Sequence, residues 1–275
     1  MKMNIRLKIG LVILAIFTLG SLILPFLMEI DPSRQGSYPK NLPPSLEHPL
    51  GTNSLGQSIF WFLVIAIRNS LLLGVSVSCV TTLTAGITGL LAGYVGGWLD
   101  RVLTALMDTF IAIPAFPILI VLSTLVRGNT SFFTVGAILV FFGWPWSART
   151  VRAMALSLRE REFISMAKFS GASTLEIVFK EVFPYVYPLL VVAYIDAILW
   201  VTTTEAALAV IGLSKVEIPT LGSIIFWALS FNALFIGQYM WVVAPVVATI
   251  ILFLGIFLTS TGYNQMYATR RGHDV

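Results

Sequence analysis

Long apolar runs alternate with short polar intervals along the whole chain. The first run, residues 9–28, has no charged residue over 20 positions. A helix needs about 20 apolar residues to cross a hydrocarbon core about 30 Å thick, so this run predicts a membrane span. The same criterion predicts six spans, which are residues 9–28, a segment within 69–99, and residues 102–126, 132–148, 184–211 and 239–262.

Three other intervals are not predicted to cross the membrane. Residues 29–50 are polar and rich in proline, which indicates a loop outside the membrane. Residues 52–68 mix polar and apolar positions and favour a helix lying along the membrane surface. Residues 218–237 are uncharged, but Pro219, Gly222 and Asn232 favour the outer surface or a partial re-entry over a seventh span.

The composition indicates that lipid is the natural solvent of this chain. It is 57% hydrophobic and 11% charged, whereas soluble domains carry about 25% charged residues. The six-span arrangement places 12 of the 17 Lys and Arg residues on one side. Basic residues concentrate on the cytoplasmic side of membrane proteins, so both termini are predicted to be cytoplasmic. The net charge of +4 therefore indicates topology and not nucleic-acid binding.

The longest polar interval between spans, residues 149–187, carries six of the 17 basic residues. Residues 153–170 favour a helix, and Gly171 suits the left-handed position that ends one. Ser173 and Glu176 predict a capping box at the start of a second helix, which should run to about residue 183. Pro184 then marks the start of the fifth span. This pattern favours a docking element for a soluble partner over a solvated linker.

Small residues recur at one point in the second span. Gly89, Gly93 and Gly97 lie four residues apart, a spacing that lets helix backbones approach closely in lipid. We expect this stripe to serve packing within the chain in preference to a contact between two copies.

Three acidic residues, Asp108, Asp196 and Glu205, are the titratable candidates inside the predicted spans. Acidic side chains in a membrane are costly and face protein or water. Hydrogen bonding to the backbone or to hydroxyl groups, such as those of residues 202–204 near Glu205, is favoured over a place on a translocation pathway.

The sequence offers little support for catalysis or metal binding. His48 and His273 are the only histidines and lie outside the predicted spans, which argues against a histidine-ligated metal or a serine–histidine site in the bilayer. The chain contains no G-x-x-x-x-G-K-[ST] motif, so it cannot hold ATP phosphates by that route. We predict neither a catalytic nor a metal site.

Four stretches resemble one family. SMAKFSG at residues 165–171, with Pro184 thirteen positions later, resembles the EAA-type loop of binding-protein-dependent ABC importer permeases, although Ser165 stands where Glu is usual and Met166 where Ala is. HPLGTNSLG (48–56), LAGYVGGWLD (91–100) and LSLREREF (156–163) are similar to the C-type permease subunit of the dipeptide/oligopeptide group. The resemblance covers roughly residues 48–265.

The resemblance implies an all-α polytopic membrane protein with six transmembrane helices, the type I ABC importer permease fold and a cytoplasmic coupling helix. It divides the chain into a cytoplasmic N-terminus with the first span (1–28), an extracytoplasmic loop with an interfacial segment (29–68), a permease core (69–265) and a cytoplasmic tail (266–275). The coupling loop is residues 149–184. Its candidate ATPase-coupling residues are Glu162, Ser165, Ala167, Lys168, Gly171, Ala172 and Pro184.

The resemblance also implies a function and partners. The chain would form half of the pathway for di- or oligopeptides, and a second homologous permease subunit would form the other half. Two separate subunits would bind ATP and Mg²⁺, and an extracytoplasmic binding protein would deliver the cargo. Members of the same group carry β-linked oligosaccharides, nickel complexes or opines, which stay open as alternative cargoes. An autonomous channel or an intramembrane enzyme is a remote alternative, because neither a polar pore stripe nor a catalytic pair is found.

Overall fold

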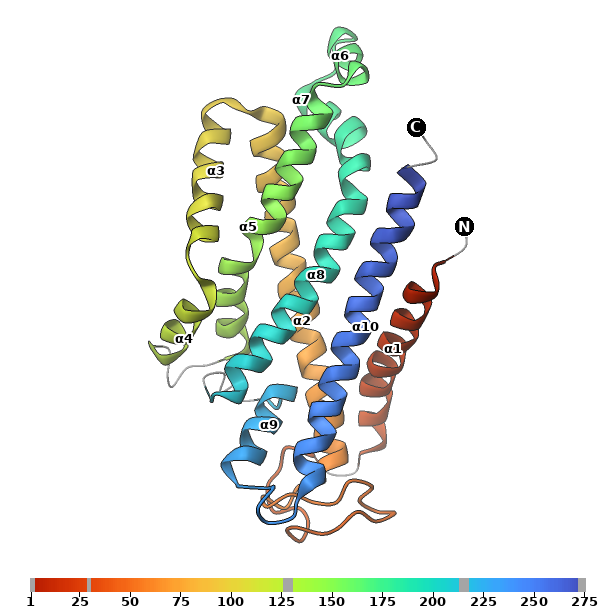
Figure 1. Ribbon diagram of the computed structural model, residues 1–275, viewed down its shortest axis with the longest axis vertical. Helices are drawn as coiled ribbons and strands as arrows, with labels where there is room; N and C mark the ends of the chain where they lie inside the picture. Colours follow the sequence, from red (N-terminus) through yellow and green to blue (C-terminus); the bar gives the residue numbers. More distant parts are fainter. Residues whose placement is uncertain (1–2, 29–30, 126–130, 213–217, 272–275) are drawn as a thin grey trace.

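A computed structural model describes residues 3–28, 31–125, 131–212 and 218–271 of the chain. In these residues the regular structure is helical, apart from one isolated bridge between Thr52 and Ser58. Figure 1 shows long helices running roughly side by side, with short helices at both ends. This arrangement is the all-α polytopic fold expected from the alternating apolar runs.

The helices follow one another without long connections after residue 59. They are α1 (Ile5–Ile23) with the 3₁₀ turn η1 (Leu24–Leu27), α2 (Ile59–Leu90) with the π turn η2 (Leu91–Val95), α3 (Gly97–Ala112), α4 (Ala115–Leu125), α5 (Phe132–Arg159), α6 (Glu162–Phe169), α7 (Thr174–Ile177) with the π turn η3 (Val178–Val182), α8 (Phe183–Val210), α9 (Leu221–Ser230) and α10 (Tyr239–Arg271).

Four helical segments of the described chain are long and apolar enough to cross a membrane, namely Ile5–Leu27, Ile59–Val95, Thr174–Val210 and Tyr239–Tyr267. The pair α3 and α4 would make a fifth span, and it is bent by 79°. The remaining predicted span, residues 132–148, is the fourth along the chain and forms the first part of α5. α5 has 28 residues, but its Trp-Pro-Trp segment and its arginines make it less apolar than the other segments.

The third predicted span contains Pro114 and Pro117, which predict a bend in it. The bend between α3 and α4 lies at Pro114. Ile113 adopts an extended conformation (ψ 123°), which is what steric contact with a following proline favours. Pro114 has no amide hydrogen to continue the helical ladder, so α3 ends before it. Pro117 lies in the first turn of α4, where a proline is tolerated.

The separate surface helix expected over residues 52–68 is not observed. α2 begins at Ile59 and runs without a break through the expected second span. Ile59, Phe62 and Ala66 are buried in a core shared with α9 and α10, and this burial holds the first turns of α2 inside the bundle. With η2 the helical segment has 37 residues and is roughly 55 Å long, more than a hydrocarbon core requires.

Two of the three spaced glycines confirm close packing within the chain. A Cβ atom at Gly89 would lie 2.6 Å from the carbonyl oxygen of Ala148, and one at Gly93 would lie 2.5 Å from that of Arg152. These positions therefore let α2 and η2 touch the backbone of α5. Gly97 is different, because it has a positive φ of 69° and open space around its Cβ position. It belongs to the turn that starts α3.

Small residues also allow the first and last helices, α1 and α10, to pack closely against each other. α1 lies along α10 (Figure 1), where a Cβ atom at Gly262 would lie 2.5 Å from the backbone nitrogen of Leu7. α10 continues to Arg271, so most of the tail expected at residues 266–275 is helical. Residues 29–30 and 272–275 of the predicted loop and tail lie outside the described residues.

Residues 218–237 do not form a long span in the described part of the chain. α9 has ten residues, and its Leu221, Ile224 and Ala228 are buried in the core shared with α2 and α10. The side chain of Asn69 in α2 donates to the carbonyl oxygen of Pro219 at 2.8 Å, which fixes the start of the segment. This short helix agrees with the expectation that no seventh span is present here.

Candidate functional site

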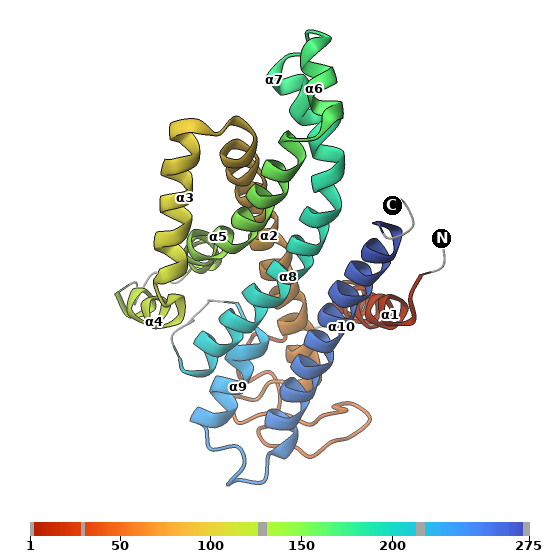
Figure 2. The ribbon, with the colours of Figure 1, turned by 45° about the horizontal axis from the view of Figure 1, so that its top comes forward.

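The central polar interval forms a hairpin at one end of the molecule, which we call the tip hairpin (residues 160–182). Figure 1 shows α6 and α7 beyond the ends of α3 and α10, and Figure 2 shows the same projection from a second direction. The helix expected over residues 153–170 is divided, because the chain leaves helical geometry at Glu160 and Arg161. The start of α1 and the end of α10 point toward the same end of the bundle.

The turn after α6 is a Schellman motif. Gly171 has φ +81°, its amide donates to the carbonyl of Lys168, and the amide of Ala172 donates to that of Ala167. These two bonds satisfy carbonyl groups that the end of a helix leaves free. The spacing of Ala167, Gly171 and Ala172 therefore has a local structural reason, independent of any partner.

The start of α7 forms half of the expected capping box. The Ser173 hydroxyl accepts a hydrogen bond from the Glu176 amide at 3.3 Å. The Glu176 carboxylate does not complete the box, because it lies 2.6 Å from the ammonium group of Lys180, one turn further along. Both side chains of this ion pair are exposed, so it adds little to stability.

The sequence predicted that the second helix of the hairpin ends near residue 183. In the structure this helix continues into the membrane segment. α7, η3 and α8 form one helical run, Thr174–Val210. The π turn η3 ends two residues before Pro184, whose missing amide hydrogen interrupts the helical ladder in this region. The tip hairpin and α8 are thus joined without a flexible connection.

A buried cluster supports the base of the tip hairpin. Its members come from η2, α5, the hairpin itself and the start of α8, and they are Tyr94, Val151, Leu158, Ile164, Ile177, Val182 and Val186. Ile164 and Val182 are fully buried. Burying a side chain of this size contributes about 1.5–3 kcal/mol. The cluster therefore fixes the orientation of the hairpin relative to α5 and α8.

The outer surface of the tip hairpin carries four large exposed apolar side chains among its charged residues. Phe169 is 92% exposed, and Met166, Leu175 and Phe179 are also largely exposed. Lys168 adds a positive charge beside them, with its nitrogen 5.9 Å from the centre of the Tyr94 ring. Large apolar side chains that cluster on a projecting polar element are typical of an interaction site.

The predicted coupling residues divide into two groups. Ala167, Gly171 and Ala172 shape the turn, whereas the others are exposed. Glu162, Ser165 and Lys168 are exposed on α6, and Pro184 is exposed in the first turn of α8. Their contact with an ATPase stays a prediction.

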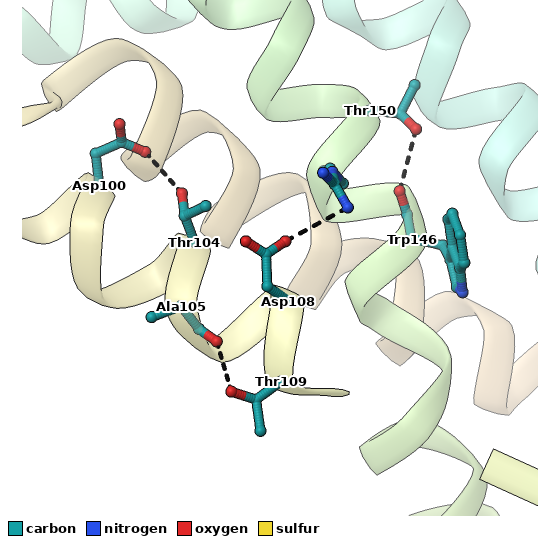
Figure 3. Close-up of polar contacts among 8 residues, drawn as sticks. Asp100, Thr104, Ala105, Asp108, Thr109, Trp146 and Thr150 are labelled. Atoms are coloured by element: carbon teal, nitrogen blue, oxygen red, sulfur yellow. Dashed lines mark hydrogen bonds and ion pairs between the residues drawn. The ribbon is translucent and has the colours of Figure 1, made fainter. Parts of the chain in front are cut away.

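Two ion pairs join α3 to α5 below the tip hairpin. Figure 3 shows the contact of Asp100 with Thr104 and the ion pair of Asp108. Arg152 binds Asp100 through two hydrogen bonds of 2.5 and 2.9 Å, and Thr104 donates to the same carboxylate at 3.1 Å. Asp108 lies 3.4 Å from Arg149, and both side chains are more than half exposed. Sequence reasoning did not identify the Asp100–Arg152 pair, because the two residues are 52 positions apart and no spacing rule connects them.

The other two acids inside the spans bind hydroxyl groups of distant elements. Glu205 is 1% exposed and accepts a hydrogen bond of 2.8 Å from Thr220, the N-cap of α9. The sequence suggested hydroxyl partners among residues 202–204, but Thr202 and Thr203 donate to main-chain carbonyls of their own helix. Among the described residues, the hydroxyl that contacts Glu205 is that of Thr220. The Ser260 hydroxyl of α10 donates to Asp196.

Metal binding has no support in the described part of the chain. No group of three or more His, Cys, Asp or Glu side chains there could hold an ion. The acids inside the predicted spans lie on two helices, Asp108 on α3 and Asp196 and Glu205 on α8.

The fold and the tip hairpin define a multi-pass helical membrane protein with a projecting helical hairpin at one end. The chain belongs to the family of the binding-protein-dependent transport system inner membrane component, whose model matches residues 85–272. Together with the apolar helices, this membership identifies a multi-pass inner-membrane protein.

Individual relatives agree with the family. The chain is 38% identical over 172 residues to the oligopeptide transport system permease protein OppC of Mycobacterium tuberculosis, and the match covers 62% of this chain and 57% of that protein. It is 29% identical over 253 residues to the dipeptide transport system permease protein DppC of Bacillus subtilis, covering 88% of this chain and 78% of the relative.

A solved structure supports the fold. A chain of the MetNI methionine ABC transporter, in an inward-facing conformation, has a TM-score of 0.54 and 19% identity, and the match covers 74% of this chain and 97% of that one. The likeness at this identity concerns the fold, which is that of a type I importer permease.

Proposed function

We propose that this chain is the permease subunit of an ATP-driven importer and forms half of the translocation pathway for di- or oligopeptides. The observation that carries the proposal is the exposed apolar surface on a rigidly supported hairpin. Phe169 and its apolar neighbours face solvent, yet Ile164 and Val182 fix the hairpin to α5 and α8. A separate ATPase subunit docked on this surface would transmit force directly into α8.

The remaining components belong to the same proposal. Two partner subunits bind ATP and Mg²⁺ and hydrolyse the ATP, and a second permease subunit completes the pathway. A binding protein delivers the cargo from outside the cell. Peptide is the cargo that the names of the relatives support, since they are an oligopeptide and a dipeptide permease.

Replacing Phe169 with alanine tests the docking surface. Loss of a Phe side chain from an interface costs about 2 kcal/mol, or roughly 30-fold in affinity. We expect the tagged wild-type chain to co-purify with an ATPase subunit in mild detergent, and Phe169→Ala to lose most of that subunit.

Phe235 provides the matched control. It is 90% exposed and lies between α9 and α10, at the end of the molecule opposite the tip hairpin. Phe235→Ala should retain the ATPase subunit. Equal retention by both variants would exclude the tip hairpin as the docking site, and absence of any ATPase from the wild-type preparation would contradict the importer assignment.

A further inference from the structure

Asp196 occupies the midpoint of α8. It is the fourteenth of 28 residues, so roughly 20 Å of helix lies on either side of it. Its side chain is nonetheless exposed in the isolated chain. A carboxylate at this depth is costly in lipid and normally faces protein or a water-filled cavity.

The packing of α8 shows which way Asp196 faces. Tyr194 donates to the carbonyl of Val75 in α2, and a Cβ atom at Gly74 of α2 would lie 3.4 Å from the Ile198 side chain. Asp196 lies two residues from each of these α2-facing positions. Since a helix turns about 100° per residue, Asp196 points to the opposite face, away from α2.

Two neighbouring helices border this outward face of α8. On one side Ser260 of α10 donates to the Asp196 carboxylate. On the other side Trp200 packs against α5, where a Cβ atom at Gly143 would lie 2.9 Å from its ring. Figure 1 shows α8 in front of α2, between α5 and α10. Thr203, seven residues after Asp196, is exposed on the same face.

The charge of Asp196 has no counter-ion in the described part of the chain. The salt bridges there join other residues. Between residues 182 and 214 the charged residues are Asp196 and Glu205, and residues 218–269 contain none. A single hydroxyl hydrogen bond orients a carboxylate but does not neutralise it, so this face is suited to a cationic group.

We infer that Asp196 lies on the translocation pathway and binds the protonated amino group of the peptide cargo. The inference rests on the proposed function, because it requires an importer of peptides. α8 continues directly from the tip hairpin, so a carboxylate on α8 moves with the element on which the ATPase would dock. This continuity favours mobile cargo over a fixed basic side chain of a second subunit as the group that Asp196 binds.

The position of Asp196 is tested by labelling, which does not depend on the cargo. Cys79 is the only cysteine of this chain, so the Cys79→Ser substitution leaves the chain without a thiol. In the complete assembly, Asp196→Cys should react with a charged, membrane-impermeant methanethiosulfonate. The control is Ile16→Cys, midway along α1 and 65% exposed, which should not react because we expect it to face lipid. Equal protection of both thiols would overturn the inference.

The role of Asp196 is tested by transport. The native assembly is reconstituted in liposomes with saturating binding protein and tetra-alanine, and both import and ATP hydrolysis are measured. Asp196→Asn should lower the number of peptides imported per ATP about tenfold, the effect of losing one charge-assisted hydrogen bond. Asp196→Glu should stay within about threefold of wild type.

The remaining outcomes are distinct. Unchanged import by Asp196→Asn would overturn the inference. If Asp196→Asn lost the second permease subunit while Asp196→Glu kept it, Asp196 would pair with that subunit, and the inference would again be wrong. If the wild-type assembly hydrolysed ATP but imported no tetra-alanine, the peptide assignment would fail, and labelling alone would decide whether Asp196 lies on the pathway.

Discussion

At the scale of single residues, two ion pairs between α3 and α5 have the same chemistry but different surroundings. Arg152 and Asp100 form a two-bond contact, and their side chains are 24% and 20% exposed. Arg149 and Asp108 are 3.4 Å apart and 56% and 51% exposed. Partial burial reduces screening by water, and the fork of the guanidinium matches a carboxylate. The first pair should therefore be the stronger one.

A double-mutant cycle on each pair measures this difference. Arg152→Gln and Asp100→Asn, alone and together, should give a coupling energy of about 1–2 kcal/mol in the unfolding of the detergent-solubilised protein. The matched cycle on Arg149 and Asp108 should give less than about 0.5 kcal/mol. Equal coupling energies in the two cycles would show that geometry and burial do not make the Arg152–Asp100 pair stronger than the Arg149–Asp108 pair.

At the scale of helices, α5 is held between α2 on one side and α3 on the other. Gly89 and Gly93 allow the backbone of α5 to touch α2 and η2, and Arg152 of α5 also binds Asp100 of α3. α5 leads directly to the tip hairpin, whose base it shares. The close contact between α2 and α5 therefore also fixes the position of α2 relative to the tip hairpin.

Adding one methyl group to α2 tests this contact. Gly89→Ala places a Cβ atom 2.6 Å from a main-chain carbonyl, which cannot move freely, so we expect a loss of stability of about 1–3 kcal/mol. Gly86→Ala is the control, because its nearest neighbour is the flexible end of Leu190 at 3.3 Å. The control should be neutral or gain up to about 1 kcal/mol from helix propensity. The measurement is the midpoint temperature of thermal unfolding in detergent. Equal shifts of this temperature in both variants would contradict the packing argument.

At the scale of the whole molecule, the short helices, the loops and the ends of the chain are divided between two ends of the helical bundle. The tip hairpin, the start of α1 and the end of α10 lie toward one end, while α9 and the loop before α2 lie toward the other (Figure 1). The distribution of basic residues predicts that the first end is cytoplasmic.

Thiol labelling in cells tests this orientation. In the Cys79→Ser background, Leu46→Cys, which is fully exposed in the loop before α2, should react with an impermeant reagent in cells whose inner membrane is intact. Ser165→Cys on the tip hairpin should react only after the inner membrane is opened. Labelling of Ser165→Cys in intact cells would reverse the orientation and contradict the proposed docking of a cytoplasmic ATPase.

The sequence by itself determined the features that depend on neighbours along the chain. Uninterrupted apolar runs predicted the membrane helices, Pro114 predicted the bend, and Gly171 and Ser173 predicted the turn between the two helices of the tip hairpin. Each of these follows from local backbone geometry or from hydropathy over about 20 residues. The family resemblance rested on motifs of the same local kind.

Only the tertiary structure decided which side chains meet and which faces are covered. The pairing of Arg152 with Asp100, the burial of Glu205 against Thr220, and the continuation of α2 to Ile59 depend on contacts between distant segments. The same holds for the exposure of Phe169 and for the outward direction of Asp196. Hydropathy is nearly uniform around α2 and α8, so their sequences lack the polar and apolar faces that identify a buried side in a soluble protein.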